Sequence, residues 1–140
     1  MAGRPSGPKT RCSGKWTEAK FRSFIKNNLR RASIKWAPIQ EVLSEARTKR
    51  GFYHCDGCNQ EVPASIKIDG VRHKNIYVDH IEPIVDPAVG FTTWDCVIDR
   101  MFCEKDNLQA LCKACHDAKT QEENQVAKER RAQEKLNDRD

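Results

Sequence analysis

Two Cys-x-x-Cys pairs are the residues of this 140-residue sequence whose spacing most directly indicates chemistry. Cys55 and Cys58 form the first pair, Cys112 and Cys115 form the second, and 53 residues lie between the two pairs. Two such pairs can present four thiolates tetrahedrally to one zinc ion. The spacing therefore predicts a structural Zn²⁺ site that joins the two ends of a long folded insert.

The composition indicates why such a site is needed. Only 38% of the residues are hydrophobic and 32% are charged, so the core must be small. Such a chain usually needs a metal ion or disulfides to stabilise it. Seven cysteines cannot all pair within the chain, and the reduced thiols of a cytoplasmic protein favour metal binding over disulfides. Three cysteines have no partner at ligand spacing: Cys12, Cys96 and Cys103. We expect the last two to be small core residues.

Three short motifs lie within the insert and directly after it. They are Asp79-His80-Ile81-Glu82-Pro83, then Asn107-Leu108-Gln109, then Cys-Lys-Ala-Cys-His-Asp-Ala-Lys-Thr, which ends at Thr120. This pattern resembles the HNH nucleases, in the subgroup where two Cys-x-x-Cys pairs bracket the active site. The resemblance covers about residues 52–120, and the family's His/Asn/His signature falls on His80, Asn107 and His116. The stretch 90–102 is similar to the insert of small bacteriophage-type members.

The resemblance implies a metal-dependent DNA endonuclease that hydrolyses phosphodiester bonds and leaves 5′-phosphate and 3′-hydroxyl ends. It implies that His80 is the general base, a role that suits a neutral imidazole. It also implies that Asp79 and His116 bind a catalytic divalent cation such as Mg²⁺ or Mn²⁺. Asn107 either orients His80 by fixing its loop or joins the metal shell, and we favour the orienting role.

The fold implied by the resemblance is the ββα-metal (His-Me finger) unit, in which two antiparallel strands and a helix surround the cation. We therefore expect an α+β protein. Neighbours on a strand point to opposite faces, so Asp79 can face the cation while His80 reaches the water. On the following helix, Cys115 and His116 are about 100° apart, so one can bind zinc while the other points at the cation.

Local patterns predict the elements that position these residues. They are a hairpin around Asp69-Gly70, a strand over 76–78 leading into Asp79, a helix from Thr93, a strand over 107–111, and a final helix from Lys113. The last helix has almost no apolar residues after Gln121. We expect that part to be solvated and to fray.

The first 50 residues are strongly basic, with 13 Lys and Arg against 3 Asp and Glu, whereas the remaining 90 have 12 against 17. The sequence predicts a helix here that Thr17 caps, with Trp16 packing on Phe21 as a hydrophobic staple. It also predicts a second helix that begins at Pro38 and ends at Gly51. These helices form a DNA-binding unit or a scaffold for the next module. The predicted DNA-binding residues are Lys20, Arg22, Lys26, Arg30, Arg31 and, near the site, Lys119.

Four segments are expected: a flexible basic arm (1–15), a basic helical region (16–51), an HNH nuclease domain (52–120) and a charged helical tail (121–140). No apolar run approaches membrane-spanning length and no secretory signal is recognisable, which favours the cytoplasm of a bacterial or phage-infected cell.

The expected partner is double-stranded DNA, with a homodimer or a phage packaging or replication protein as further possibilities. A monomer should nick one strand. The alternatives are a non-catalytic zinc-stapled DNA-binding module and an accessory nuclease of a phage packaging machine.

Overall fold

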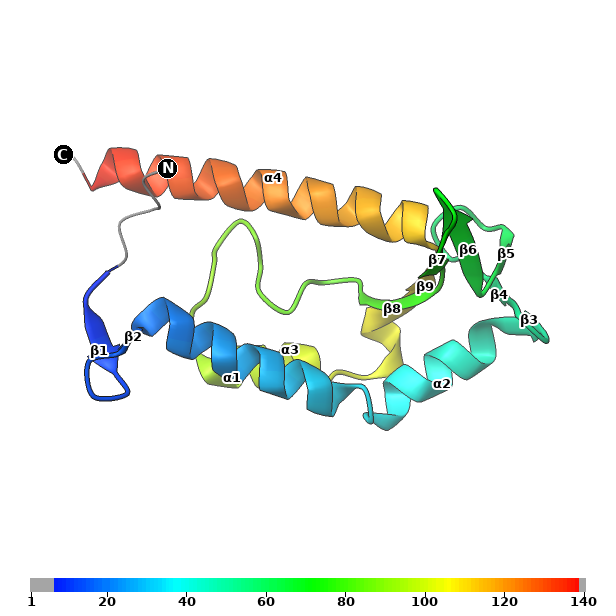
Figure 1. Cartoon of the computed structure of the whole chain (residues 1–140), viewed down its shortest axis with the longest axis horizontal. Helices are drawn as coiled ribbons and strands as arrows, with labels where there is room; N and C mark the ends of the chain where they lie inside the picture. The colour runs from blue at the N-terminus through cyan, green and yellow to red at the C-terminus, as the bar shows by residue number, and fades with distance from the viewer. Residues whose placement is uncertain (1–6, 139–140) are drawn as a thin grey trace. The chain divides into compact units, whose positions relative to one another are not determined.

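The computed structural model describes residues 7–138 and has a mixed α+β fold, as expected (Figure 1). In this part of the chain, four α-helices accompany small antiparallel sheets. None of these helices combines the length and the apolar character needed to cross a membrane. The chain divides into two compact units, Met1–Lys35 and Trp36–Asp140. The division falls inside the predicted region 16–51, so its two helices belong to different units.

The first unit consists of a short hairpin and one helix. Its elements are β1 (Lys9–Arg11), β2 (Trp16–Thr17) and α1 (Glu18–Ser33), with β1 antiparallel to β2. The flexible arm was predicted over 1–15. Residues 1–6 lie outside the described residues, whereas residues 9–11 are strand because backbone pairing with β2 orders them.

The start of α1 confirms the predicted cap but not the predicted staple. The Thr17 hydroxyl accepts a hydrogen bond from the Lys20 backbone N–H at 3.1 Å. The Trp16 ring packs edge-on against Phe24, with 5.2 Å between centroids, rather than against Phe21. Phe21 instead lies under the guanidinium of Arg11, which the hairpin brings to 4.2 Å from the ring centroid.

The second unit opens with a helix and a three-stranded sheet. They are α2 (Ala37–Ala46), β3 (Arg47–Lys49), β4 (Phe52–His54) and β5 (Glu61–Pro63), in the sheet order β3-β4-β5. Pro38 lies in the first turn of α2, as predicted. The expectation that α2 continues to Gly51 is wrong, because residues 47–49 leave the helix and pair with β4.

A regular hairpin follows, and it matches the sequence prediction. Its strands are β6 (Ser65–Ile68) and β7 (Val71–Lys74). The two turn residues, Asp69 and Gly70, both have positive φ, 52° and 78°. This conformation is the one that an Asp-Gly turn favours.

The strands and helix that position the site come last. β8 (Tyr77–His80) is antiparallel to β9 (Leu108–Leu111), and α4 (Lys113–Asn137) begins directly after β9. Between the two strands lie α3 (Trp94–Met101) and a 3₁₀ turn, Lys105–Asn107. The buried apolar residues of the chain belong mainly to this region: Ile76, Ile84, Val97, Met101, Leu108, Ala110 and Leu111.

Two sequence expectations differ from the structure here. Cys96 was expected in the core but is exposed, because Val97 and Met101 form the buried face of α3. Cys103 is half-buried. The tail after residue 120 remains helical to Asn137, and it is not solvated on all sides. The Arg130 guanidinium lies so close to Gly90 that a side chain at Gly90 would collide with it.

Candidate functional site

Four cysteines converge where the three-stranded sheet approaches the start of α4. The Sγ atoms of Cys55, Cys58, Cys112 and Cys115 all lie within 4.8 Å of one another. A tetrahedral zinc ion with Zn–S bonds of about 2.3 Å places its sulfur ligands roughly 3.8 Å apart. The predicted ligands are therefore brought together, and this cluster could hold a metal ion such as zinc.

The backbone around the cluster is shaped for close approach. A Cβ added at Gly57 would lie 3.0 Å from both Cβ and Sγ of Cys115, so the first pair tolerates only a small residue there. The neighbouring Asp56 ties this turn to β9. Its backbone N–H donates to the Ala110 carbonyl at 2.7 Å, and its carboxylate accepts from the Ala110 N–H at 2.8 Å.

The thiols of Cys55 and Cys115 differ in how readily they ionise. Burial opposes ionisation of Cys55, but hydrogen bonds from the backbone amides of Cys112, Cys58 and Gly57 outweigh it and lower its pKa to about 6. A hydrogen bond with Cys112, together with burial, raises the pKa of Cys115 to about 12. Metal binding would therefore begin most readily at Cys55, and it would displace the proton of Cys115.

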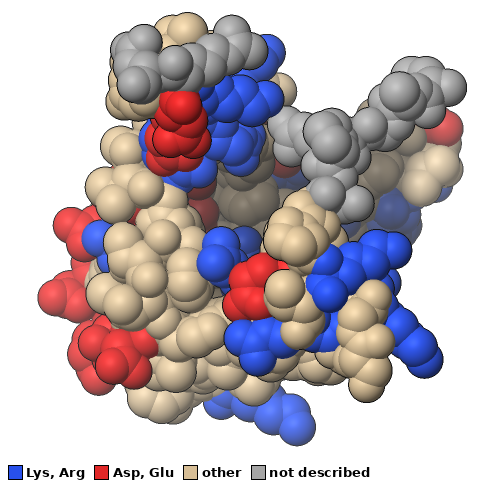
Figure 2. All heavy atoms as spheres, turned by 90° about the vertical axis from the view of Figure 1, so that its left-hand side faces the viewer, with Lys and Arg blue, Asp and Glu red and all other residues tan. Residues whose placement is uncertain are grey.

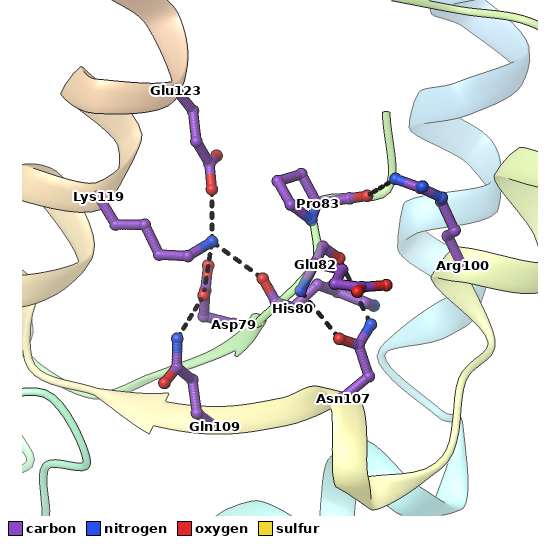
Figure 3. Close-up of polar contacts among 9 residues, drawn as sticks. All are labelled: Asp79, His80, Glu82, Pro83, Arg100, Asn107, Gln109, Lys119 and Glu123. Carbon is purple, nitrogen blue, oxygen red and sulfur yellow. Dashed lines mark hydrogen bonds and ion pairs between the residues drawn. The ribbon is translucent and has the colours of Figure 1, made fainter. Parts of the chain in front are cut away.

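One face of β8 is turned toward α4. Tyr77 and Asp79 share this face because side chains alternate along a strand. The Tyr77 ring stacks on His116, with 4.5 Å between centroids and 11° between planes. The Asp79 carboxylate accepts from Gln109 at 3.1 Å and pairs with the Lys119 ammonium at 3.0 Å (Figure 3). His116 and Lys119 are one turn apart and form the facing surface of α4.

His80 has a defined hydrogen bond at the end of β8. Its Nε2 lies 3.0 Å from the backbone carbonyl oxygen of Met101, the fully buried last residue of α3. Because a carbonyl oxygen only accepts, this contact requires the proton on Nε2 and leaves Nδ1 with a lone pair. The fold therefore holds His80 in a tautomer that can accept a proton at Nδ1.

Asn107 fixes the two residues after His80. Its side-chain Oδ1 accepts from the Glu82 N–H at 2.8 Å, and its backbone carbonyl accepts from the Ile81 N–H at 2.9 Å (Figure 3). Its Nδ2 also approaches the Glu82 carbonyl at 3.4 Å. Both its side chain and its backbone are thus used to hold the His80 loop, which favours the orienting role over a place in a metal shell.

His116 retains an unused nitrogen. Its Nδ1 is buried and makes no hydrogen bond with the described residues, and the Asp117 carboxylate lies 3.7 Å away. An imidazole nitrogen and the Asp79 carboxylate are donors that suit a divalent transition metal or Mg²⁺. Among residues 7–138, the group of three or more His, Cys, Asp or Glu side chains close enough to hold a metal is the four cysteines. Asp79 and His116 do not belong to such a group among the described residues.

Lys119 is placed differently from the prediction that it contacts DNA. Its ammonium points inward, to Asp79, to the His80 carbonyl at 2.9 Å and to Glu123. Burial opposes its charge, but the hydrogen bonds with Glu123 and Asp79 outweigh this and raise its pKa. Glu123 was not anticipated, although its i+4 spacing from Lys119 is a signal for such a pair.

Gln109 belongs to the Asn107-Leu108-Gln109 motif but was given no role from sequence, and Arg100 was missed. Gln109 lies directly opposite Asp79 in the β8–β9 register, which explains their contact. Arg100 of α3 donates to the Pro83 carbonyl at 2.8 Å, so α3 holds the far side of the same loop (Figure 3). No sequence pattern connects Arg100 to Pro83, because the contact depends on how α3 packs.

The predicted DNA-binding residues of the first unit are mostly accessible. Four of them are exposed on α1: Lys20, Arg22, Arg30 and Arg31. Lys26 is half-buried, and burial, with nearby Arg30, lowers its pKa. Figure 2 shows Lys and Arg side chains grouped in several places on the drawn face, among acidic and other residues.

Comparison with known proteins does not add a relative. No protein-family model matches the chain, no curated protein matches it, and no solved structure matches its fold. The assignment of a function therefore depends on the residues and geometry described above.

Proposed function

We propose that this chain is a metal-dependent DNA endonuclease of the HNH type, whose ββα-metal unit is formed by β8, β9 and α4. The observation that carries the proposal is the arrangement of His80. Its Nε2 is tied to Met101, its loop is fixed by Asn107, and the preceding residue, Asp79, lies on the opposite face of the strand. Binding alone does not need a histidine held in this tautomer beside a carboxylate.

The chemistry assigned to these residues is hydrolysis. His80 Nδ1 accepts the proton of a water molecule that attacks the phosphorus, and the Met101 carbonyl stabilises the imidazolium through Nε2–H. Asp79 and His116 would hold a divalent cation, which supplies charge neutralisation at the phosphate and the leaving oxygen when it is bound. The four cysteines would hold zinc in a structural role, and they orient the start of α4.

The exposed cations of α1 are assigned to the DNA backbone. Phosphate contacts of this kind supply affinity without sequence preference. One active site per chain cuts one strand, so a monomer nicks.

The proposal is tested with supercoiled plasmid DNA and the purified, zinc-containing protein. With Mg²⁺ or Mn²⁺ we expect relaxed circles to form before linear DNA, and we expect none with EDTA. DNA binding without metal-dependent nicking would contradict the enzymatic proposal and would support the non-catalytic zinc-stapled binding module instead.

If Asn107 orients His80, two substitutions of Asn107 should reduce nicking to different extents. Asn107→Ala removes the acceptor for the Glu82 N–H, so His80 loses its alignment and nicking should fall roughly 100-fold. Asn107→Asp keeps that acceptor and should lose much less activity. Rates are measured on the plasmid at saturating metal. If Asn107 is a metal ligand, both variants should instead change the Mn²⁺ concentration needed for half-maximal nicking.

The role of α1 predicts a change in the salt dependence of DNA binding. Arg30→Gln combined with Arg31→Gln should reduce the slope of log K against log [salt] by about 2, because each phosphate contact contributes about 1. Binding to a short duplex is measured by fluorescence anisotropy between low and moderate salt. Lys67→Gln is the matched control, since Lys67 is exposed on the β6–β7 hairpin. An equal slope for all three proteins would remove the role given to α1.

A further inference from the structure

All three N–H donors of the Lys119 ammonium have acceptors within the candidate site. The three hydrogen-bond donors of a lysine ammonium meet three oxygens: the Asp79 carboxylate at 3.0 Å, the His80 carbonyl at 2.9 Å and the Glu123 carboxylate (Figure 3). The three side chains are largely enclosed, with 23% of Lys119, 14% of Asp79 and 31% of Glu123 exposed. Lys119 is therefore an internal positive charge held by three acceptors.

This charge stands beside the carboxylate that is proposed to bind the divalent cation. Both the ammonium and the Gln109 amide contact the Oδ2 atom of Asp79. A divalent cation bound to Asp79 must either displace Lys119 from that oxygen or share the carboxylate with a neighbouring like charge. Screening by water is weak at this exposure, so either outcome opposes binding of the cation.

We propose that Lys119 is the resident counter-ion of Asp79 and that it lowers the affinity of the site for a divalent cation. Glu123 holds the ammonium in place from the next turn of α4. Lys119 thus neutralises the Asp79 carboxylate when no cation is bound, and a cation must overcome this ion pair in order to bind. This inference depends on the proposed function only in placing a cation at Asp79.

The test is the affinity for Mn²⁺ in the zinc-loaded protein, followed by the EPR signal of free Mn²⁺. Lys119→Met keeps the length of the side chain and removes its charge, and it should bind Mn²⁺ at least about 5-fold more tightly than wild type. Lys119→Gln should behave in the same direction. Lys128→Met is the matched control on the same helix, because Lys128 is exposed and lies more than two turns beyond Lys119 along α4.

Two results would overturn the inference. One is equal Mn²⁺ affinity in wild type and in Lys119 variants that retain zinc and melt cooperatively. The other is a gain in affinity that persists in Asp79→Asn combined with Lys119→Met, since the effect would then arise elsewhere.

A measurement on the wild-type protein makes the test independent of the variants. In protein labelled in its lysine side chains, the Nζ and Cε signals of Lys119 should shift as Mg²⁺ saturates the site, while those of exposed Lys128 stay unchanged. Unchanged Lys119 signals would overturn the inference. Tighter Mn²⁺ binding by the variants without any nicking would contradict the nuclease proposal alone. Nicking by wild type with unaltered metal affinity in the variants would contradict this inference alone.

Discussion

Replacement of His80 by alanine should abolish most metal-dependent nicking, with a loss of roughly 100- to 10,000-fold, the range that general-base catalysis contributes. The reason is that Nδ1 of His80 is the basic nitrogen left free once Nε2 is bonded to Met101. DNA binding should change little, because the cations assigned to the backbone lie on α1. The measurement is the initial rate of plasmid nicking at saturating Mg²⁺ or Mn²⁺.

Two further variants separate catalysis from folding. His80→Gln offers an amide that can donate to the Met101 carbonyl but has no basic nitrogen, so it should be as inactive as His80→Ala and nearer to wild type in stability. His73→Ala is the matched control, because His73 lies in the β6–β7 hairpin. Nicking by His80→Gln at the wild-type rate would show that another group accepts the proton, and the assigned role of His80 would be lost.

Removal of zinc should unfold the second unit. Structural zinc in small domains contributes about 10–16 kcal/mol of binding free energy, which is as large as the whole net stability of a typical domain, about 5–15 kcal/mol. The cluster is also part of the core, where buried Cys55 and Cys112 pack with Leu111. We therefore expect about one zinc per chain by elemental analysis, and loss of cooperative melting when a strong chelator removes it.

Single substitutions provide a sharper form of this prediction. Cys112→Ser should release zinc and lose near-UV circular dichroism, because Cys112 is both a proposed ligand and buried. Cys12→Ser is the matched control, since Cys12 lies exposed in the β1–β2 turn and should leave zinc content unchanged. A chelated protein that still melts at the wild-type temperature would show that the four cysteines are not what holds the unit together.

Local signals in the sequence were sufficient where the determining interaction spans a few residues. Thr17 caps its helix as predicted, and the helix predicted from Thr93 begins there with a similar cap, because a hydroxyl reaches the N–H three positions on. The hairpin at Asp69 and Gly70 forms because both residues accept positive φ. The two Cys-x-x-Cys pairs also predicted a long-range feature, the four-sulfur cluster, since the ligand types and spacings for a tetrahedral metal are restrictive.

Local signals were insufficient wherever two elements compete for the same residues. Residues 47–49 lie within the predicted second helix, yet they pair with β4 because backbone pairing with that strand outweighs a weak local helix preference, even with a register shift between Arg47 and Lys49. Cys96 lies one position from Val97, and only the packing of α3 decides which of the two is buried. The tail after residue 120 contacts Gly90 through Arg130, a contact between residues 40 apart that periodicity does not encode.

The sequence by itself predicted the four cysteines that cluster, the β6–β7 hairpin, the elements β8, α3, β9 and α4, and the identity of the candidate catalytic residues. It did not predict the strands β3, β4 and β5. Only the tertiary structure decided how those residues are engaged: His80 on the Met101 carbonyl, Asn107 on the loop after His80, and Lys119 turned inward onto Asp79 rather than outward. The physical reason is that residue type and spacing specify which chemistry is possible. Protonation, orientation and charge balance depend on neighbours that folding brings from distant positions in the chain.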